Sequence, residues 1–115
     1  MRDLHGPKSK LGFSWPDMKL TLLIKPEASH DISDAYAWYK SERPGLGKNF
    51  AEAFEQACER VLFDPESFAA VVGFVRWVPL KRFPHGVHFL VEADRVVVLA
   101  VLHGRRSLKT LAERI

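Results

Sequence analysis

The segment VVVLAVL, residues 96–102, decides the fold of this 115-residue chain. It is apolar at every position and rich in β-branched valine, a composition that favours a strand. A strand that lacks polar alternation is typically buried on both of its faces. We therefore expect residues 96–102 to form a central strand of a sheet, around which the rest of the fold is arranged.

The residues before this segment carry the signals of two further strands. Residues 71–78 are rich in β-branched and aromatic side chains, and residues 87–92 also have the composition of a strand. Residues 84–86 (PHG) and 93–95 (ADR) supply turns between successive strands. The C-terminal part of the chain is therefore predicted to be a three-stranded meander.

Two amphipathic helices precede the meander. The first begins near Pro26, whose missing N–H costs nothing in a first helical turn. Its apolar positions recur at helical spacing: Ala28, Ile32, Ala35, Tyr36 and Tyr39. A turn at residues 42–47 (ERPGLG) leads into a second, cleaner stripe: Leu46, Phe50, Ala53, Phe54, Ala57 and Val61. Asp64-Pro65 ends this stripe, so the two helices are predicted to form a hairpin.

A short strand at residues 19–25 (KLTLLIK) precedes the first helix, which gives the order β-α-α-β-β-β. This order predicts an α+β fold in which the helical hairpin packs on one face of a small, mostly antiparallel sheet. The chain is long enough for one domain with one core. We assign residues 18–115 to that domain and expect residues 1–17 to be a flexible N-terminal extension.

Composition and motifs exclude several classes of protein. The single Cys58 can form neither an intrachain disulfide nor a paired zinc site, and we expect it in the core. No apolar run approaches the ~20 residues that span a bilayer, and no secretory signal is present, so we expect a cytoplasmic protein without membrane contact. Residues 44–47 (PGLG) lack the context of a phosphate-binding loop. We expect no cofactor and no metal, and we place His30, Asp31 and Asp34 on a solvated helix face.

Positive charge is concentrated near the C-terminus. Residues 1–75 hold 9 Lys/Arg and 11 Asp/Glu, a balance of −2, whereas residues 76–115 hold 8 Lys/Arg and 3 Asp/Glu, a balance of +5. Such an excess attracts an anionic partner, either nucleic acid or an acidic protein segment. The alternative is a well-solvated basic surface.

This basic third supplies the candidate functional residues. We expect contacts with a partner or target from Arg76, Lys81, Arg82, His103, Arg105 and Arg106. Turns between the strands would bring one smaller group within reach of one another: Arg82, His85, His88 and His103. Such a group could cleave RNA, with cations on the phosphates and a histidine moving protons, or it could grip an acidic protein surface. Any one histidine, His88 in particular, could instead be an ordinary strand residue.

Four segments in this order resemble the RelE/ParE toxin superfamily. They are residues 28–39 (ASHDISDAYAWY), 44–50 (PGLGKNF), 78–85 (VPLKRFPH) and 96–106 (VVVLAVLHGRR). The first resembles the family's first helix, the second its turn into the second helix, and the last its final strand with a basic end. The resemblance covers about residues 18–106 and implies the same α+β fold.

The resemblance also implies a choice between two activities. RelE-like members are ribosome-dependent endoribonucleases that cut messenger RNA, typically with a basic set and a tyrosine near the C-terminus. ParE-like members inhibit DNA gyrase and have no catalytic residues for RNA cleavage. Here the only tyrosines, Tyr36 and Tyr39, lie in the first predicted helix. The chain therefore resembles the ParE branch, and we expect no catalytic residues; His85, His88, His103 and Arg82 are the candidates if it is a ribonuclease.

A toxin of this kind implies a cognate, ParD-like antitoxin and a role in plasmid stabilisation or stress. The antitoxin would form a hetero-oligomer with the toxin and fold a disordered C-terminal segment on its surface. DNA gyrase would be the second partner, and promoter DNA would be bound only through the antitoxin. A non-toxic binding module with the same fold is the remaining alternative.

Overall fold

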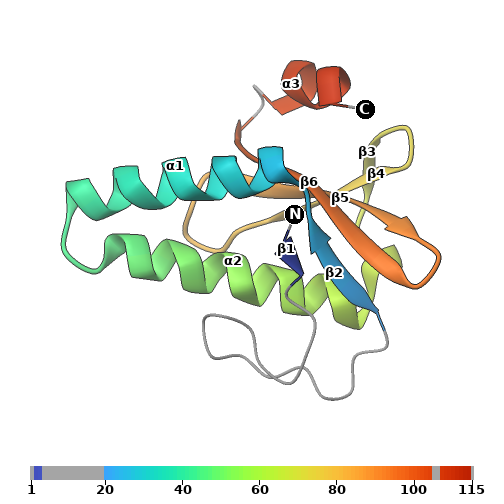
Figure 1. Cartoon of the computed structure of the whole chain (residues 1–115), viewed down its shortest axis with the longest axis horizontal. Coiled ribbons are helices and arrows are strands. Elements are labelled where there is room, and N and C mark those ends of the chain that lie inside the picture. The colour runs from blue at the N-terminus through green and yellow to red at the C-terminus, as the bar shows by residue number, and fades with distance from the viewer. Residues whose placement is uncertain (1, 4–19, 105–106, 115) are drawn as a thin grey trace.

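The computed structural model describes residues 2–3, 20–104 and 107–114 of the chain (Figure 1). In this part of the chain the elements are β1 (Arg2–Asp3), β2 (Thr21–Ile24), α1 (Pro26–Glu42), α2 (Leu46–Phe63), a 3-10 turn (Pro65–Ser67), β3 (Ala70–Val72), β4 (Val75–Pro79), β5 (His85–Glu92), β6 (Arg95–His103) and α3 (Ser107–Arg114). None of the helices among these described residues is both long and apolar enough to cross a membrane.

The described strands form one sheet in the order β1-β2-β6-β5-β4-β3. Strands β2 and β6 are parallel, with Leu22 opposite Val96, and the other neighbouring pairs are antiparallel. A parallel pair needs a long connection, which the helical hairpin begins after β2. Strand β6 thus has a partner on each side, and its predicted central position is confirmed.

The side chains of β6 are buried on both faces of the sheet. On one face they pack with the helical hairpin, through Val96, Val98 and Val101. On the other they pack with Leu111 of α3, through Val97, Leu99 and Ala100. The uniform apolar character of residues 96–102 is explained by these two cores.

A register shift between β5 and β6 affects which side chains share a face. His88 lies opposite Ala100 and Phe89 lies opposite Val98, so Leu99 has no partner across the strands. Such a bulge interrupts the simple alternation of a strand. Leu99 and Ala100 consequently both belong to the core beneath α3.

The helical hairpin follows its two stripes closely. Helix α1 begins at Pro26 as predicted, and Gly45, with φ +82°, stands at the N-terminus of α2. The stripe of α2 is buried at Phe50, Ala53, Phe54, Ala57 and Val61, with Leu46 packed at its edge. In α1 the burial is less complete, because Tyr36 is 38% exposed. The two helices lie side by side (Figure 1), and Cys58 is buried in the core as expected.

Three expectations about the elements were wrong or incomplete. Residues 71–78 are not one strand: they contain a hairpin, with β3 and β4 joined at Gly73 (φ +54°) and Phe74. Residues 84–86 are not a turn, because β5 already begins at His85 and the turn lies at residues 81–84. Helix α3 was not predicted.

The predicted N-terminal extension, residues 1–17, lies outside the described residues except for Arg2–Asp3. These two residues pair antiparallel with β2, Arg2 opposite Ile24. The first described strand is therefore an edge strand contributed by the very start of the chain.

Candidate functional site: a histidine pair, a charged groove and a partly buried ion pair

His85 and His103 face one another at the ends of β5 and β6. They are direct partners in the antiparallel register, and their ring centroids lie 5.3 Å apart at an interplanar angle of 82°. The ring of His85 also meets Tyr39 and Phe50 edge-on, at 5.8 and 5.2 Å. Burial and the neighbouring His103 lower the pKa of His85, with Asp31 acting in the opposite direction. His85 is therefore neutral at neutral pH.

His88 lies on the opposite face of the sheet from this pair. It is 2% exposed and stands opposite Ala100, in the core beneath α3. Burial lowers the pKa of His88, although backbone hydrogen bonds at Ala100 and Gly86 oppose that effect. Sequence reasoning placed His85, His88 and His103 together, but the structure brings together only His85 and His103.

A pocket opens beside the histidine pair, between α1 and the ends of β5 and β6. Its volume is about 480 Å³, and its lining is Ala35, Trp38, Tyr39, Pro84, His85 and His103. We call it the ring pocket. Arg82 does not line it, so that cation is separate from the histidines it was predicted to join.

Three of the predicted contact residues have different roles: Arg76, Lys81 and Arg82. Arg76 holds the segment after α2, because its Nη1 donates to the carbonyl oxygens of Glu66 (3.2 Å) and Phe68 (2.6 Å). Lys81 and Arg82 are exposed on the turn after β4 and line an open groove beside α2. Arg76 is thus engaged within the fold, whereas Lys81 and Arg82 are available to a partner.

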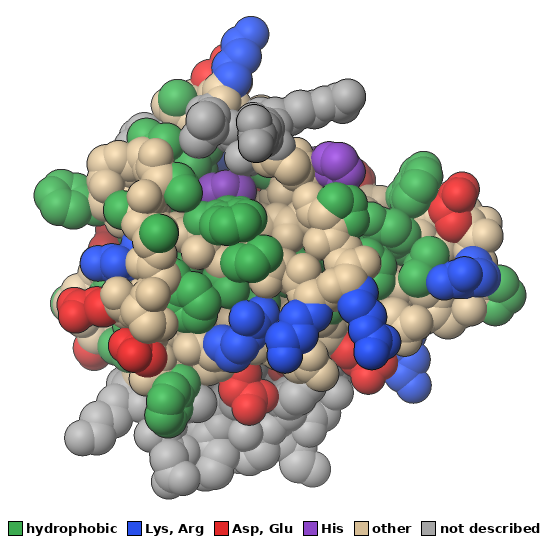
Figure 2. Space-filling model, turned by 180° about the vertical axis from the view of Figure 1, so that it is seen from behind, with side chains coloured by type: hydrophobic (Ala, Val, Ile, Leu, Met, Phe, Trp, Pro, Cys, Tyr) green, Lys and Arg blue, Asp and Glu red, His purple; other side chains and the backbone are tan. Residues whose placement is uncertain are grey.

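Two grooves run along α2 and share Gln56 and Lys81. The first, of about 600 Å³, reaches Arg43 and Arg82, and the second, of about 790 Å³, reaches Arg60 and Phe63. Phe63 is 80% exposed. Seen from behind the view of Figure 1, Lys and Arg side chains form a row beside hydrophobic side chains (Figure 2). We call the two connected spaces the α2 groove.

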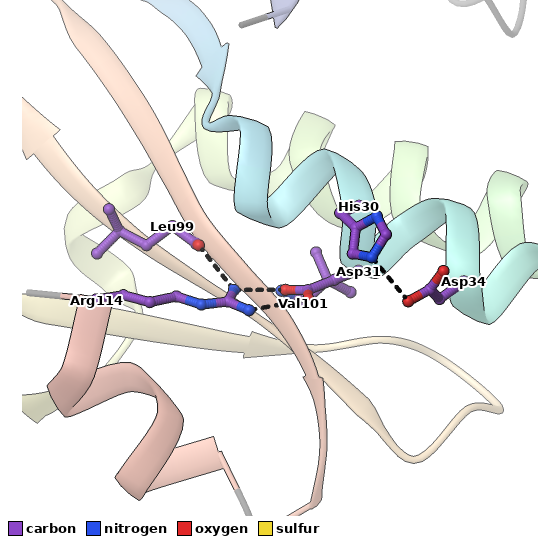
Figure 3. Close-up of polar contacts among 6 residues, drawn as sticks. All are labelled: His30, Asp31, Asp34, Leu99, Val101 and Arg114. Carbon is purple, nitrogen blue, oxygen red and sulfur yellow. Dashed lines mark hydrogen bonds and ion pairs between the residues drawn. The ribbon is translucent and has the colours of Figure 1, made fainter.

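The prediction that Asp31 lies on a solvated helix face is wrong, because its side chain is largely buried against β6 and Arg114 (Figure 3). Its Oδ2 accepts hydrogen bonds from the backbone N–H of Val101 (3.0 Å) and from Nη1 of Arg114 (2.7 Å), and its Oδ1 accepts one from Nη2 of Arg114 (3.1 Å). Nη1 of Arg114 also donates to the carbonyl of Leu99 at 3.3 Å. The hydrogen bonds that Arg114 donates to Asp31 raise the pKa of its guanidinium.

The neighbours of Asp31 on the same helix behave differently. His30 and Asp34 form an ion pair at 3.4 Å with side chains 76% and 70% exposed, so these two residues do lie on the expected solvated face. Among the described residues, no three His, Cys, Asp or Glu side chains gather in a way that could hold a metal ion. The remaining predicted contact residues, Arg105 and Arg106, lie outside the described part of the chain.

Comparison with known proteins gives two positive findings. A family model described as the ParE toxin of the type II toxin–antitoxin system parDE matches residues 22–108. A solved structure, the chromosomal ParDE toxin–antitoxin system from P. aeruginosa, matches with a TM-score of 0.67 at 17% sequence identity, over 77% of this chain and 100% of that chain. A likeness at this identity bears on the fold alone, and it confirms the predicted α+β class. No curated protein matches the sequence.

Proposed function

This chain belongs to the ParE toxin family of type II toxin–antitoxin systems, and on that premise we propose that it inhibits DNA gyrase and is held inactive by a ParD-like antitoxin. The observation that carries the proposal is the family match over residues 22–108, which runs from β2 to the start of α3. The expected role is in plasmid stabilisation or the response to stress. We place the toxin in the cytoplasm, where gyrase acts.

The α2 groove is the surface that we assign to the antitoxin. Helix α2 has 18 residues and is therefore about 27 Å long, which is enough for several turns of a docked helix. The groove combines exposed cations, Lys81 and Arg82, with the exposed ring of Phe63. Acidic residues also line it, namely Glu52, Glu59 and Asp64, so we expect the acidic side chains of a partner to lie at Lys81 and Arg82. A disordered segment that carries acidic and apolar side chains would gain both ion pairs and apolar burial when it folds there.

The surface that acts on gyrase is assigned to the basic end after β6, at Arg105 and Arg106. In the sequence, both residues come soon after His103, the last residue of β6. Gyrase acts on DNA, and clustered arginines are suited to bind the negatively charged phosphates of DNA held by gyrase. We assign the binding of promoter DNA to the antitoxin.

The experiment is induction of the chain with and without its antitoxin gene, read out by growth and by a DNA-damage reporter. Purified protein is then added to gyrase and relaxed plasmid, and we expect loss of supercoiling and accumulation of cleaved DNA. The Arg105→Ala/Arg106→Ala variant should lose this effect, while Lys109→Ala, a change of one exposed cation in α3, should retain it. A double variant that folds normally and stays fully toxic would remove the assignment of these arginines.

Messenger-RNA cleavage is the second candidate, and the His85–His103 pair favours it. Two rings at 5.3 Å, one of them neutral because its pKa is lowered, could accept and donate protons at a ribose and a leaving oxygen. A translating extract distinguishes the candidates: cleaved message that His103→Ala abolishes supports the ribonuclease, and intact message removes it. A non-toxic binding module would produce no growth defect without its antitoxin.

A further inference from the structure

We propose that the α2 groove recognises its partner at two separate points. At one point Arg43 and Arg82 bind a carboxylate side chain between them, and at the other an apolar side chain packs on Phe63. The proposal rests on the assignment of the α2 groove to a protein partner. It adds which chemical groups that partner presents and how far apart they lie.

The two spaces of the α2 groove differ in charge. The first space has a formal balance of +2, from Arg43, Lys81, Arg82 and Glu52. The second space has a balance of zero, from Arg60, Lys81, Glu59 and Asp64. The second space also contains the 80% exposed ring of Phe63. An anionic group is therefore favoured in the first space, and an apolar group is favoured beside Phe63.

Acidic residues in both spaces select a protein segment over nucleic acid. A nucleic acid strand carries a phosphate at every nucleotide, so a strand lying along the groove would meet Glu52, Glu59 and Asp64 as well as the cations. A protein segment can place a single carboxylate in the first space and uncharged side chains in the second. The occupant is thus a segment with separated acidic and apolar side chains.

The cations of the first space are not used within the fold. Among the residues that the structure describes, the side chains of Arg43, Lys81 and Arg82 form no ion pair and no hydrogen bond, and all three residues are exposed. Arg60 differs, because it donates to the carbonyl oxygen of Pro79 at 3.1 Å. The planar guanidinium groups of Arg43 and Arg82 therefore remain available, and their geometry suits the two oxygens of a carboxylate.

The backbone of Arg82 adds an independent indication. Its φ is +71°, in the left-handed region where a Cβ is unfavourable. At three other left-handed positions of the described chain the residue is glycine: Gly45, Gly73 and Gly104. The side chain of Arg82 thus costs stability while forming no ion pair or hydrogen bond within the described fold. Backbone strain of this kind is typical of residues that serve a function outside folding.

Helix α2 sets the distance between the two contacts. Asn49 lines the first space and Phe63 lines the second. They are separated by about 14 residues of one helix, which is a rise of about 21 Å. A helical segment that lies along α2 must therefore carry its carboxylate and its apolar side chain about 14 residues apart. A segment with both groups on adjacent turns can make only one of the two contacts.

The test measures binding of fluorescein-labelled peptides to the purified full-length chain by anisotropy. Each peptide has about 20 residues on a helical Ala/Gln background with an amidated C-terminus. Two Glu residues lie near one end and two Leu residues lie on the same face near the other. Comparison peptides carry Gln in place of Glu, or the same Glu and Leu residues on adjacent turns. Both chain directions are made for every design.

We expect one direction to bind at least tenfold more tightly than its Gln and adjacent-turn counterparts. The preference over the Gln peptide should shrink as salt is added. Equal binding of the Glu and Gln peptides overturns the proposal, and so does equal binding of the spaced and adjacent-turn peptides. Absence of binding in both directions up to about 1 mM also overturns it.

Variants of the protein then locate the carboxylate. Arg43→Gln and Arg82→Gln should each weaken binding of the Glu peptide about tenfold and leave the Gln peptide unchanged. Arg95→Gln is the matched control, because it makes the same change in net charge at an arginine outside the groove. Equal weakening by Arg95→Gln and Arg82→Gln would reduce the effect to overall charge. Tighter binding of a single-stranded DNA probe through the same two arginines would assign them to nucleic acid. Either result overturns the proposal.

Arg82→Gly separates binding from stability. Arg82→Ala keeps a Cβ at the same φ, so Arg82→Gly should have the higher thermal midpoint by a few degrees, while both variants bind the Glu peptide equally weakly. Ala93→Gly is the positive control, since Ala93 also has a positive φ (51°) and lies outside the groove. It should raise the midpoint without affecting peptide binding. A midpoint for Arg82→Gly no higher than that for Arg82→Ala would overturn the functional reading of the strain.

These assays contain neither gyrase nor growing cells, so their outcome is separate from that of gyrase inhibition. If the antitoxin neutralises the chain but the peptides fail, the two-point recognition is wrong and the proposed function stands. If the peptides bind as expected but the chain is not toxic, the proposed function fails and the recognition stands.

Discussion

Replacing Asp31 by alanine should destabilise the fold far more than replacing any neighbouring polar residue of α1. The carboxylate lies beyond the end of β2, beside the part of β6 that no strand of the described residues flanks on that side. It accepts the N–H of Val101 and holds Arg114 through two hydrogen bonds. Asp31 therefore accepts a backbone hydrogen bond at the edge of β6 and also holds α3 in place through Arg114.

The expected magnitude follows from these contacts. The N–H of Val101 would lose its acceptor, which costs about 1–3 kcal/mol for a buried polar group. Removing one partner of a buried ion pair costs about 3–5 kcal/mol, but that figure is an upper bound here because the side chains of Arg114 and Asp31 remain 21% and 12% exposed. The two losses share one carboxylate and are not additive. We expect Asp31→Ala to lower the free energy of unfolding by about 2–4 kcal/mol.

Urea denaturation followed by circular dichroism measures this loss. Asp34→Ala is the matched control, because it removes a carboxylate of the same helix whose ion pair with His30 is exposed, and it should cost less than about 0.5 kcal/mol. Hydrogen exchange should become faster in α3 for Asp31→Ala only. The double-mutant cycle with Arg114→Ala should give a coupling above about 1 kcal/mol. Equal costs for Asp31→Ala and Asp34→Ala, or no coupling, would refute the reasoning.

Three other perturbations have definite expected results. Burial lowers the pKa of His88 in the folded protein. As the pH falls below about 6.5, His88 is therefore protonated more readily in the unfolded chain than in the folded protein. The contribution of neutral His88 to stability is thus retained above that pH and lost below it. His88→Leu should reduce this loss between pH 7.5 and 5.5 in urea titrations, by at most about 1.4 kcal/mol per pH unit, and an unchanged slope would contradict the assignment. A Cβ at Gly86 would overlap the indole of Trp77, so Gly86→Ala should lower the thermal midpoint, and adding Trp77→Ala should recover part of it; no recovery would mean that the indole is not the obstacle. Lys81→Glu/Arg82→Glu should weaken antitoxin binding at least tenfold in calorimetry without changing the thermal midpoint, and unchanged affinity would exclude the α2 groove as the docking surface.

Much of the fold could be predicted from the spacing of apolar residues and from the residues that begin or end helices and strands. The spacing of apolar residues in α2 places the same residues in the core, because a helix that faces a sheet must bury one stripe. Pro26 marks the start of α1, and the apolar run of β6 indicates its burial on both faces. These features depend on the local sequence and on the packing of helices against the sheet.

The hairpin formed by β3 and β4 was missed because both strands are short and the β-branched and aromatic residues continue from one into the other. Gly73 was the available signal, since a positive φ at a turn favours glycine. Helix α3 was missed because an eight-residue helix has little periodic signal, and its position depends on Leu111 and Arg114 reaching β6. Contacts between residues 83 positions apart, such as Asp31 with Arg114, leave no local pattern in one sequence.

The candidate site was predictable in part. The predicted turn at residues 84–86 put His85 outside the strand, so the alternation of side chains along β5 was not applied to His85 and His88. In one continuous strand, residues three apart point to opposite faces, so His85 and His88 could not act together. The pairing of His85 with His103 depends on the register of β5 and β6, which the hydrophobic pattern alone does not determine.

The Asp31–Arg114 pair also has a consequence for the behaviour of the protein in concentrated solution. An uncovered edge of a long apolar strand is a template on which another chain can add a strand, and natural sheets protect such edges. Along the second half of β6 the carboxylate of Asp31 and the guanidinium of Arg114 occupy the N–H of Val101 and the carbonyl of Leu99 that a foreign strand would need. Removal of α3, by proteolysis or by truncation, would therefore uncover this edge of β6, and we expect aggregation of the protein to increase.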